Sequence, residues 1–541
     1  MRYTVTRLQK RIRARRPAAK FRRLGWLVVA LGTACASESL EVKENCGDPP
    51  CEPSRATPAV LSITPEDGDI GAEPKGVVRI RFNTELDAGC VSAENVVVLE
   101  GNEAVPGKLT YADTQITFAP SADLALLATY RVLIKAGLTS AGGIPMGREF
   151  ASEFTVRDGT WTSPSSVGRS WLSGLSADAA GGFVLGWEAE NVAHVRNYSG
   201  GRWKEDDQVL CTSCLRSSLG GNSHGDAVAV ALDFDGIARA KQFRQGTWQA
   251  DSDEVCHLTS YVPQAAISAT VAPTGEVRAL FVDGDTVRTR HTDRYGVWSG
   301  GTDTAGSIRS APVLAFNDAG TGFVAWTAYD EASETSAARF VRLPAADNVV
   351  DTIPSSVDAG DALGALTMAV ASNGEAEALW VSAGALMASH YTGTGWSSEA
   401  PPTGSETAGI CAQPSVVFDG EVFVAAWGQL ARGEDTPCIV HTSRRHDGSW
   451  EDSGVRSDSR SSAAVSEPLH LRADAWGNLT LLWTASGQAT YVRFNHATTT
   501  WSAPVSAFPG HVSVARSLVG ASGTLLAAFE NGGNVETALF R

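Results

Sequence analysis

A glycine followed six residues later by a large aromatic side chain recurs along most of this 541-residue sequence. The step joins Gly181 to Trp187, Gly275 to Phe281, Gly320 to Trp326, Gly374 to Trp380, Gly477 to Trp483 and Gly523 to Phe529. Two units differ from this pattern. In one, the step from Gly420 to Trp427 is one residue longer, and in the other Ala231 takes the place of the aromatic residue after Gly225. Counted by these turn glycines, units begin about every 49 residues, close to the length of a propeller blade.

The even step places the glycine and the aromatic ring on the same face of one strand, because side chains alternate with period two. Small apolar residues stand between them, as Ala376 and Ala378 do before Trp380. The opposite face is mixed, with Glu375 and Glu377 in the same strand. We therefore expect each ring to pack against a neighbouring blade, and each glycine to occupy a turn that requires positive φ.

A second series of tryptophans runs in phase with the glycines and begins a short segment in each unit. It comprises Trp161, Trp203, Trp248, Trp298, Trp396, Trp450 and Trp501, and the position expected near Asn348 lacks a tryptophan. Each unit then has four strands, so residues 159–541 are predicted to form an eight-bladed β-propeller, with seven blades as the alternative count. The strand Trp161–Gly168 would complete the last blade and leave no free sheet edge. A series of β-sandwiches is the main rival architecture.

Residues 58–158 have a different pattern, with seven short apolar segments separated by turns every eight to twelve residues. Alternation is clear in Val78-Ile80-Phe82, as in a β-sandwich. The segments Ser62-Ile63-Thr64-Pro65-x-x-Gly68, Ile80-x-Phe82, Thr117-Phe118-x-Pro120, Leu124, Thr129-Tyr130 and Phe154-Thr155 resemble a bacterial Ig-like domain of the S-layer-protein type. This resemblance implies a spacer or adhesion module without catalysis. The chain is thus predicted to be all-β.

The N-terminus is typical of an exported protein. Residues 1–34 hold ten Lys and Arg and no Asp or Glu, and Leu24–Ala34 is an apolar run of signal-peptide length. The run Leu31-Gly32-Thr33-Ala34-Cys35 resembles a bacterial lipobox, although Gly32 stands where that motif usually has Leu. We expect a signal peptide over 1–34, lipidation of Cys35, and a tether over 35–57. An ordinary cleaved signal is the alternative.

The predicted localisation follows from the N-terminal sequence, and the predicted partners follow from the net charge of the rest of the chain. Ala36, rather than Asp, follows the cysteine, which in lipoproteins of this kind implies the outer membrane or cell surface. Beyond residue 34 the chain has 44 − 10 = 34 basic against 60 acidic residues, a charge of −26. Since phosphate contact needs clustered positive charge, this argues against a nucleic-acid partner.

Eight cysteines remain after Cys35, and export favours disulfides among them. They are Cys46, Cys51, Cys90, Cys211, Cys214, Cys256, Cys411 and Cys438. Cys46 and Cys51 could pair locally, or one of them could pair with Cys90. Cys411 and Cys438 flank the inner strands of one blade and are expected to pair. Cys211, Cys214 and Cys256 with His257 could instead bind zinc, although an oxidising compartment favours the disulfide.

Functional residues are harder to assign than the architecture. Asp178, Asp318, Asn373, Asp419 and Asp474 sit beside the turn glycines and are expected to cap those turns. Trp171 and Trp476 fall outside both repeat series and are the candidates for ligand contact.

The sequence carries no Gly-x-Ser-x-Gly, His-Glu-x-x-His or phosphate-binding glycine loop, so we predict no catalytic residue, metal or cofactor. The preferred function is a lipid-anchored surface binding or scaffold module for a protein or glycan ligand. The alternative is a propeller-type glycan hydrolase or lyase whose catalytic groups come from several blades. Two or three carboxylates with a basic residue at the mouth of the central channel would favour the enzyme.

Replacing Cys35 with Ala should move the protein from the membrane fraction to the soluble fraction, because the lipid would be attached to that sulfur. Cell fractionation followed by immunoblotting measures the distribution. Cys51→Ala, which changes a cysteine of the expected tether, is the matched control and should stay with the membrane. Membrane fractionation of Cys35→Ala equal to that of the unaltered protein would contradict the lipoprotein interpretation.

Overall fold

The computed structural model describes residues 56–541 except for several loop segments. These are 178–180, 223, 260–266, 294, 306, 309–310, 331–334, 344–349, 356–365, 383, 403–404, 406–408, 431–437, 452–453, 458–467, 509–514 and 521. The predicted signal and lipidation residues, and all of the predicted tether except residues 56–57, therefore lie outside the described residues. Within them, no helix combines the length and apolar character needed to cross a membrane.

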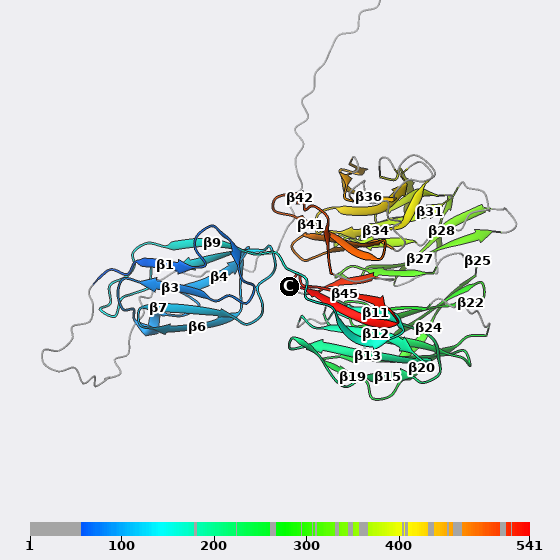
Figure 1. Ribbon diagram of the computed structural model, residues 1–541, viewed down its shortest axis with the longest axis horizontal. Coiled ribbons are helices and arrows are strands. Elements are labelled where there is room, and N and C mark those ends of the chain that lie inside the picture. Colours follow the sequence, from blue (N-terminus) through cyan, green and yellow to red (C-terminus); the bar gives the residue numbers. More distant parts are fainter. Residues whose placement is uncertain are drawn as a thin grey trace, which may run out of the picture.

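The Ig-like region consists of two facing sheets (Figure 1). One contains β1 (Val60–Thr64), β3 (Val78–Phe82), β7 (Gln115–Pro120) and β6 (Gly107–Ala112), in that order. The other contains β2 (Asp69–Ala72), β9 (Phe150–Val156), β8 (Thr129–Ile134), β4 (Val96–Glu100) and β5 (Glu103–Ala104). A single 3-10 turn, η1 (Ala88–Cys90), precedes β4. The seven expected segments are all strands, and the short β2 and β5 are added to them. The predicted alternation in β3 is confirmed, since Val78, Ile80 and Phe82 are all buried.

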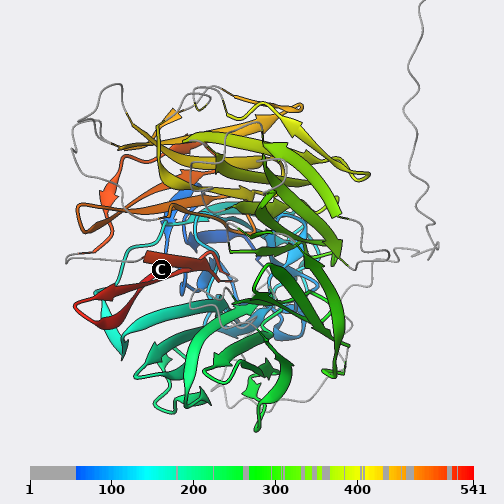
Figure 2. The same ribbon diagram turned by 90° about the vertical axis from the view of Figure 1, so that its right-hand side faces the viewer.

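The remaining strands form sheets that fan around a common centre, the arrangement of a β-propeller (Figure 2). The first unit contains β11 (Trp171–Ala177), β12 (Phe183–Ala189), β13 (Val192–Ser199), β14 (Arg202–Trp203) and β15 (Gln208–Cys211). The second contains β16 (Cys214–Gly221), β17 (Ala227–Asp233), β18 (Ile237–Arg244), β19 (Thr247–Trp248) and β20 (Asp253–His257). A parallel contact between β11 and β16 joins these two units into one ten-stranded sheet.

The third to fifth units follow the same order from the inner to the outer strand. The third contains β21 (Ile267–Val271), β22 (Val277–Asp283), β23 (Thr286–Thr292) and β24 (Trp298–Ala305). The fourth contains β25 (Ser307–Ile308), β26 (Val313–Phe316), β27 (Gly322–Asp330), β28 (Thr335–Leu343) and β29 (Val350–Ser355). The fifth contains β30 (Thr367–Val370), β31 (Ala376–Ser382), β32 (Ala385–Tyr391) and β33 (Trp396–Glu399).

The last three units complete the series. The sixth contains β34 (Ile410–Phe418), β35 (Phe423–Leu430), β36 (Cys438–His446), β37 (Ser449–Trp450) and β38 (Gly454–Val455). The seventh contains β39 (His470–Ala473), β40 (Leu479–Ala485), β41 (Gln488–Asn495), β42 (Thr500–Trp501) and β43 (Val505–Ser506). The eighth contains β44 (Ala515–Val519), β45 (Leu525–Asn531), β46 (Asn534–Phe540) and, as its outer strand, β10 (Ser165–Arg169).

The repeated glycine and aromatic residues have the expected roles. All eight turn glycines have φ between 73° and 101°, a region that favours glycine. Trp380 of the fifth unit is 1% exposed and packs with Phe323 and Phe340 of the fourth unit. The opposite face is also buried, because Leu379 packs against Trp427 of the sixth unit. The repeated aromatic side chain therefore packs neighbouring units against each other.

Strand pairing joins the start of the repeat region to the last unit, and apolar packing joins the first unit to the last. β10 pairs antiparallel with β46, from Ser165 opposite Thr537 to Arg169 opposite Asn534. The strand expected from Trp161 thus begins at Ser165, whereas Trp161 itself makes an isolated bridge with Phe540. A buried cluster joins Phe183 and Tyr198 of the first unit to Leu526 and Leu539 of the eighth.

The cysteines form two disulfides whose partners are both described. They join Cys211 to Cys214 and Cys411 to Cys438. Cys90 is buried and disulfide-bonded, while Cys46 and Cys51 lie outside the described residues. Cys256 is half-buried on β20. Because the Cys211 and Cys214 sulfurs bond to each other, they are not available as the thiolates that the zinc alternative requires.

Trp380→Ala should lower the free energy of unfolding by about 3–5 kcal/mol, because it empties a buried site between two units. Chemical denaturation followed by circular dichroism measures the change. Trp171→Ala is the matched control, since Trp171 is 66% exposed, and it should change stability by less than about 0.5 kcal/mol. Equal effects of the two substitutions would contradict the packing role of the aromatic step.

Candidate ligand-binding cleft

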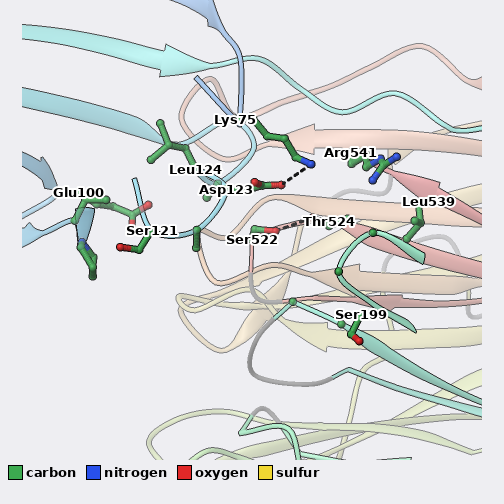
Figure 3. Close-up of a pocket in the computed structure, with 18 of the residues that line it drawn as sticks. Lys75, Glu100, Ser121, Asp123, Leu124, Ser199, Ser522, Thr524, Leu539 and Arg541 are labelled. Atoms are coloured by element: carbon green, nitrogen blue, oxygen red, sulfur yellow. Dashed lines mark hydrogen bonds and ion pairs between the residues drawn. The ribbon is translucent and has the colours of Figure 1, made fainter. Parts of the chain in front are cut away.

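A cleft of about 740 Å³ lies between the Ig-like region and one face of the propeller (Figure 3). Its first wall comes from the Ig-like region, namely Lys75, Glu100, Glu103, Ala104, Val105, Pro106, Ser121, Ala122, Asp123, Leu124, Ala125 and Tyr130. Its second wall comes from the propeller, namely Gly181, Gly182, Phe183, Tyr198, Ser199, Gly200, Gly201, Trp476, Ser522, Thr524, Leu539 and Arg541. The propeller residues belong to the first, seventh and eighth units, so both ends of the repeat region build the site.

Direct contacts between the two regions hold the walls of the cleft in place. Leu525 and Phe540 of the eighth unit belong to the same buried cluster as Leu124 and Leu126 of the Ig-like region. The Leu126 amide donates a hydrogen bond to the Ser522 carbonyl at 3.2 Å. The Ig-like region therefore packs against the last unit of the propeller, and the cleft lies beside this contact.

A carboxylate links the two walls. Glu100, at the end of β4, accepts a hydrogen bond at 2.7 Å from the indole nitrogen of Trp476 in the seventh unit. It also accepts one at 3.0 Å from the Tyr130 hydroxyl, which in turn accepts from the Ala125 amide at 2.8 Å. Burial, together with the adjacent Glu100 charge, raises the pKa of Tyr130, so this phenol stays protonated as a donor.

A second polar link joins the connecting segment to the propeller. The Arg493 guanidinium, 5% exposed, lies 3.2 Å from the Asp158 carboxylate and donates to the Thr480 hydroxyl at 2.6 Å. It also stacks over the Phe540 ring, 5.2 Å from the ring centroid. Such a shielded, multiply bonded arginine holds its partner more firmly than an exposed ion pair does. Asp158 is thus attached to the unit that carries Trp476.

The open surface of the cleft combines charges, hydroxyls and rings. Lys75 and Asp123 form an exposed ion pair at 3.9 Å on the Ig-like wall (Figure 3). Opposite them lie the Ser522 and Thr524 hydroxyls, 2.6 Å apart, and Arg541. Phe183 and Tyr198 lie under this surface and are buried, whereas the Trp476 ring is partly exposed. This lining can hydrogen-bond a polar ligand and also cover its apolar faces.

The two predicted ligand-contact tryptophans occupy different places. Trp476 lines the cleft, but its N–H group already bonds Glu100, so its first role is to join the two regions. Trp171 pairs with Glu188, at the end of β12 remote from the cleft-lining Phe183. The structure therefore does not bring the two tryptophans together, and only Trp476 belongs to this site.

Three of the turn residues predicted from the sequence, namely Asn373, Asp419 and Asp474, are turn caps. Asp474 accepts hydrogen bonds from the amides of Trp476 and Asn478, both at 2.9 Å. Asp419 and Asn373 cap their turns in the same way. In the fourth unit the cap is Asn317, which precedes the predicted Asp318. Asp178 lies outside the described residues.

One buried cluster outside the cleft has donor atoms at metal-binding distance. Oxygen or nitrogen atoms of Glu377, His390 and Glu399 all lie within 4.8 Å of one another. The Arg445 guanidinium, however, lies 2.9 Å from Glu399 and 3.7 Å from Glu377, where it supplies the positive charge. Burial and the Glu399 charge raise the pKa of Glu377. We assign this cluster to the contact between the fifth and sixth units.

Sequence reasoning missed most of the cleft, because its residues are brought together only by the seating of one region on the other. Glu100, Lys75 and Asp123 stand in ordinary polar turns, and Arg541 is separated from them by more than four hundred residues. The usable signal was Trp476, a large aromatic residue at a turn outside the repeat pattern.

A family model described as a bacterial Ig-like domain matches residues 54–156, which confirms the resemblance found over 58–158. No curated protein matches the sequence. The chain therefore combines an Ig-like domain with a region whose sheets have the arrangement of a β-propeller.

Three of the solved structures that resemble the chain show the range of its neighbours. The Dos1 propeller has 10% identity and a TM-score of 0.44, covering 70% of this chain and 94% of that one. Polysaccharide lyase Uly1 has 10% identity and a TM-score of 0.38, covering 70% and 99%. A mutant Aleuria aurantia lectin in complex with Fucalpha1-6GlcNAc has 9% identity and a TM-score of 0.33, covering 56% and 98%. With scores below 0.5, these likenesses say nothing about a ligand or activity of this chain.

Glu100→Ala should loosen the junction, because it removes the acceptor of two hydrogen bonds and leaves the Trp476 and Tyr130 donors unpaired. We expect a loss of about 1–3 kcal/mol in stability and faster amide hydrogen exchange in residues 98–105 and 474–478. Hydrogen exchange read by mass spectrometry measures both segments. Glu103→Ala, at an exposed position of the adjoining β5, is the control, and unchanged exchange in Glu100→Ala would contradict the link.

Proposed function

We propose that the protein is a surface binding protein whose cleft between the Ig-like domain and the propeller holds a glycan segment. The observation that carries the proposal is the cleft itself, whose volume of about 740 Å³ falls within the range of small-ligand sites. A sugar presents hydroxyl groups at its edge and C–H groups on its faces. The cleft offers matching partners, with the hydroxyls of Ser121, Ser522 and Thr524 together with the partly exposed ring of Trp476.

The rest of the chain suits presentation of such a site at a membrane. We propose that Cys35 carries the lipid, that residues 35–57 form a tether, and that the Ig-like domain holds the propeller away from the outer membrane. In this arrangement the Ig-like domain is also one wall of the binding site rather than a passive spacer.

We further propose that the propeller is a closed ring of eight blades. The pairing of β10 with β46 supports closure, because the strand that precedes the first unit becomes the outer strand of the last. The packing of Phe183 and Tyr198 against Leu526 and Leu539 supports it independently. The count of eight follows from the eight turn glycines, each of which stands between two paired strands of its own unit.

The lining of the propeller centre favours binding over hydrolysis. A pocket of about 320 Å³, here named the central pocket, lies among the inner strands. It is lined by Leu175, Ser176, Ala177, Gly221, Asn222, Thr270, Val271, Pro273, Phe316, Asp318, Leu518 and Val519. Small and apolar residues dominate this lining, and Asp318 is its one carboxylate. A pair of carboxylates, as glycosidases use, is not part of it.

A glycan array probed with the purified full-length protein tests the proposed function. We expect binding to a defined set of glycans, and a loss of at least about tenfold in affinity for Ser121→Trp, because the indole would fill the cleft. Ser398→Trp, on the exposed outer strand β33, is the matched control and should bind as the unaltered protein does. Absence of glycan binding, or binding unaffected by Ser121→Trp, would overturn the assignment of the ligand to this cleft.

A further inference from the structure

The central pocket lies on the same face of the propeller as the cleft. Its lining residues are the final residues of the inner strands β11, β16, β21, β26 and β44, or belong to the turns that follow these strands. The turns after β11 and β44 also carry Gly181 and Ser522, which line the cleft. The cleft and the central pocket are therefore both found where inner strands end.

Two hairpins separate the cleft from the central pocket, and each hairpin contributes residues to both. In the first unit, Ala177 lines the central pocket and Phe183, its partner across the hairpin, lines the cleft. In the eighth unit, Val519 lines the central pocket and Thr524 lines the cleft. Paired strands lie roughly 5 Å apart, so the wall between the two cavities is one hairpin thick.

A single buried cluster fixes the positions of both cavities. It joins the first and eighth units and contains Phe183 and Tyr198 from the lining of the cleft. Leu175, Ala177 and Leu518, which line the central pocket, pack against the same cluster. Because side chains in such a core are closely packed, the cleft and the central pocket keep a constant separation.

A buried hydroxyl group of the central pocket lacks a protein partner. Ser176 lines the pocket and is 3% exposed, and its oxygen forms no hydrogen bond within the described part of the chain. Gly221 leaves room for it, because a Cβ at that position would collide with the Ser176 oxygen. The Thr270 hydroxyl donates to the Gly221 carbonyl at 3.1 Å and keeps its lone pairs as acceptors. Since buried polar groups normally have a partner, the two hydroxyls are suited to bonding a polar ligand.

The central pocket also contains an aromatic ring in a fixed position. Phe316, the last residue of β26, is half-buried and pairs with Gly322 of β27. A Cβ at position 322 would collide with the Phe316 ring, so the ring lies directly against the backbone of the neighbouring strand. An aromatic ring beside hydroxyl groups matches a sugar, which has C–H groups on its faces and hydroxyls at its edge.

The charge of the central pocket restricts the kind of sugar. Asp318 is exposed and lines the pocket, and no Lys, Arg or His is among the described residues that line it. A carboxylate or sulfate group on the ligand would enter beside Asp318 without a cation to compensate it. Because like charges at close range disfavour binding, the lining favours a neutral sugar over a uronate or a sulfated sugar.

We propose that the central pocket is a second subsite for the ligand of the cleft, and that this ligand is a neutral oligosaccharide long enough to reach both. The inference rests on the proposed function, because it assigns the cleft to one part of the same glycan. Hydroxyl groups of one sugar unit bond Ser176 and Thr270, and its C–H face packs on Phe316. Another unit of the same oligosaccharide occupies the cleft.

Isothermal titration of the full-length protein with oligosaccharides of increasing length tests the second subsite. The neutral probes are cello-, malto-, manno- and chito-oligosaccharides from single sugars to hexasaccharides, and oligogalacturonates of the same lengths are the acidic probes. We expect the affinity in a neutral series to rise at least about tenfold once the chain reaches both cavities, because the second contact becomes intramolecular. The oligogalacturonates should show no such rise.

Two variants of the central pocket should remove the gain with length and leave the binding of short chains unchanged. Asp318→Trp fills the pocket from an exposed turn position and should abolish the gain. Ser176→Ala should reduce the affinity for long chains by about threefold to tenfold. It should leave the free energy of unfolding unchanged, since the hydroxyl bonds no protein group. Ser372→Trp, at the same turn position of the fifth unit and exposed, is the control and should keep the gain.

Ser121→Trp separates this inference from the cleft proposal. It should abolish binding of every length, because it fills the cleft. If it does so while affinity stays constant with length, or while Asp318→Trp keeps the gain, the second subsite is overturned and the cleft proposal stands. A rise with length in the oligogalacturonates alone would overturn the neutral ligand. Absence of binding in every series, or binding unaffected by Ser121→Trp, would overturn both proposals.

Discussion

The antiparallel pairing of β10 with β46 is the interaction on which the rest of the structure depends. β10 follows the Ig-like domain directly, and β46 is the last strand of the eighth unit, so their ladder ties the beginning of the repeat region to its final unit. The same pairing brings the Ig-like domain beside the eighth unit, where Leu525 and Phe540 join its core. The cleft exists because the Ig-like domain covers only part of the propeller face, and an open space remains beside this contact.

Packing between units uses two kinds of contact with different consequences. Most of the contact between units is apolar, and rings such as Trp380 and Trp427 pack against the preceding unit. Removing one of these rings would leave a cavity and lower the free energy of unfolding by several kcal/mol, about 3–5 for a large aromatic side chain. Between the fifth and sixth units a polar contact is added, in which Arg445 compensates Glu377 and Glu399.

The Ig-like domain and the propeller could be predicted from the sequence to the level of individual strands, because period-two alternation and turn glycines are local properties. The candidate site could not. Trp476 was recognisable as an aromatic residue outside the repeat, but its partner Glu100 belongs to the other domain, 376 residues away. Trp171 carried the same signal and lies at the opposite end of the paired strands β11 and β12. The exposure of each tryptophan, and its distance from residues of the other domain, depend on how the two regions pack together. A local sequence pattern does not contain that information.

The sequence by itself determined the all-β class, the two regions, the repeat and the positions of the turns, since each follows from the spacing of glycine, aromatic and apolar residues along one strand. Tertiary structure alone decided which residues face a ligand. Glu100 meets Trp476, and Arg541 joins a cleft with Lys75, because distant segments are brought together when the Ig-like domain packs on the eighth unit. Spacing governs how a strand is built, whereas a site depends on distances between strands that only the folded chain establishes.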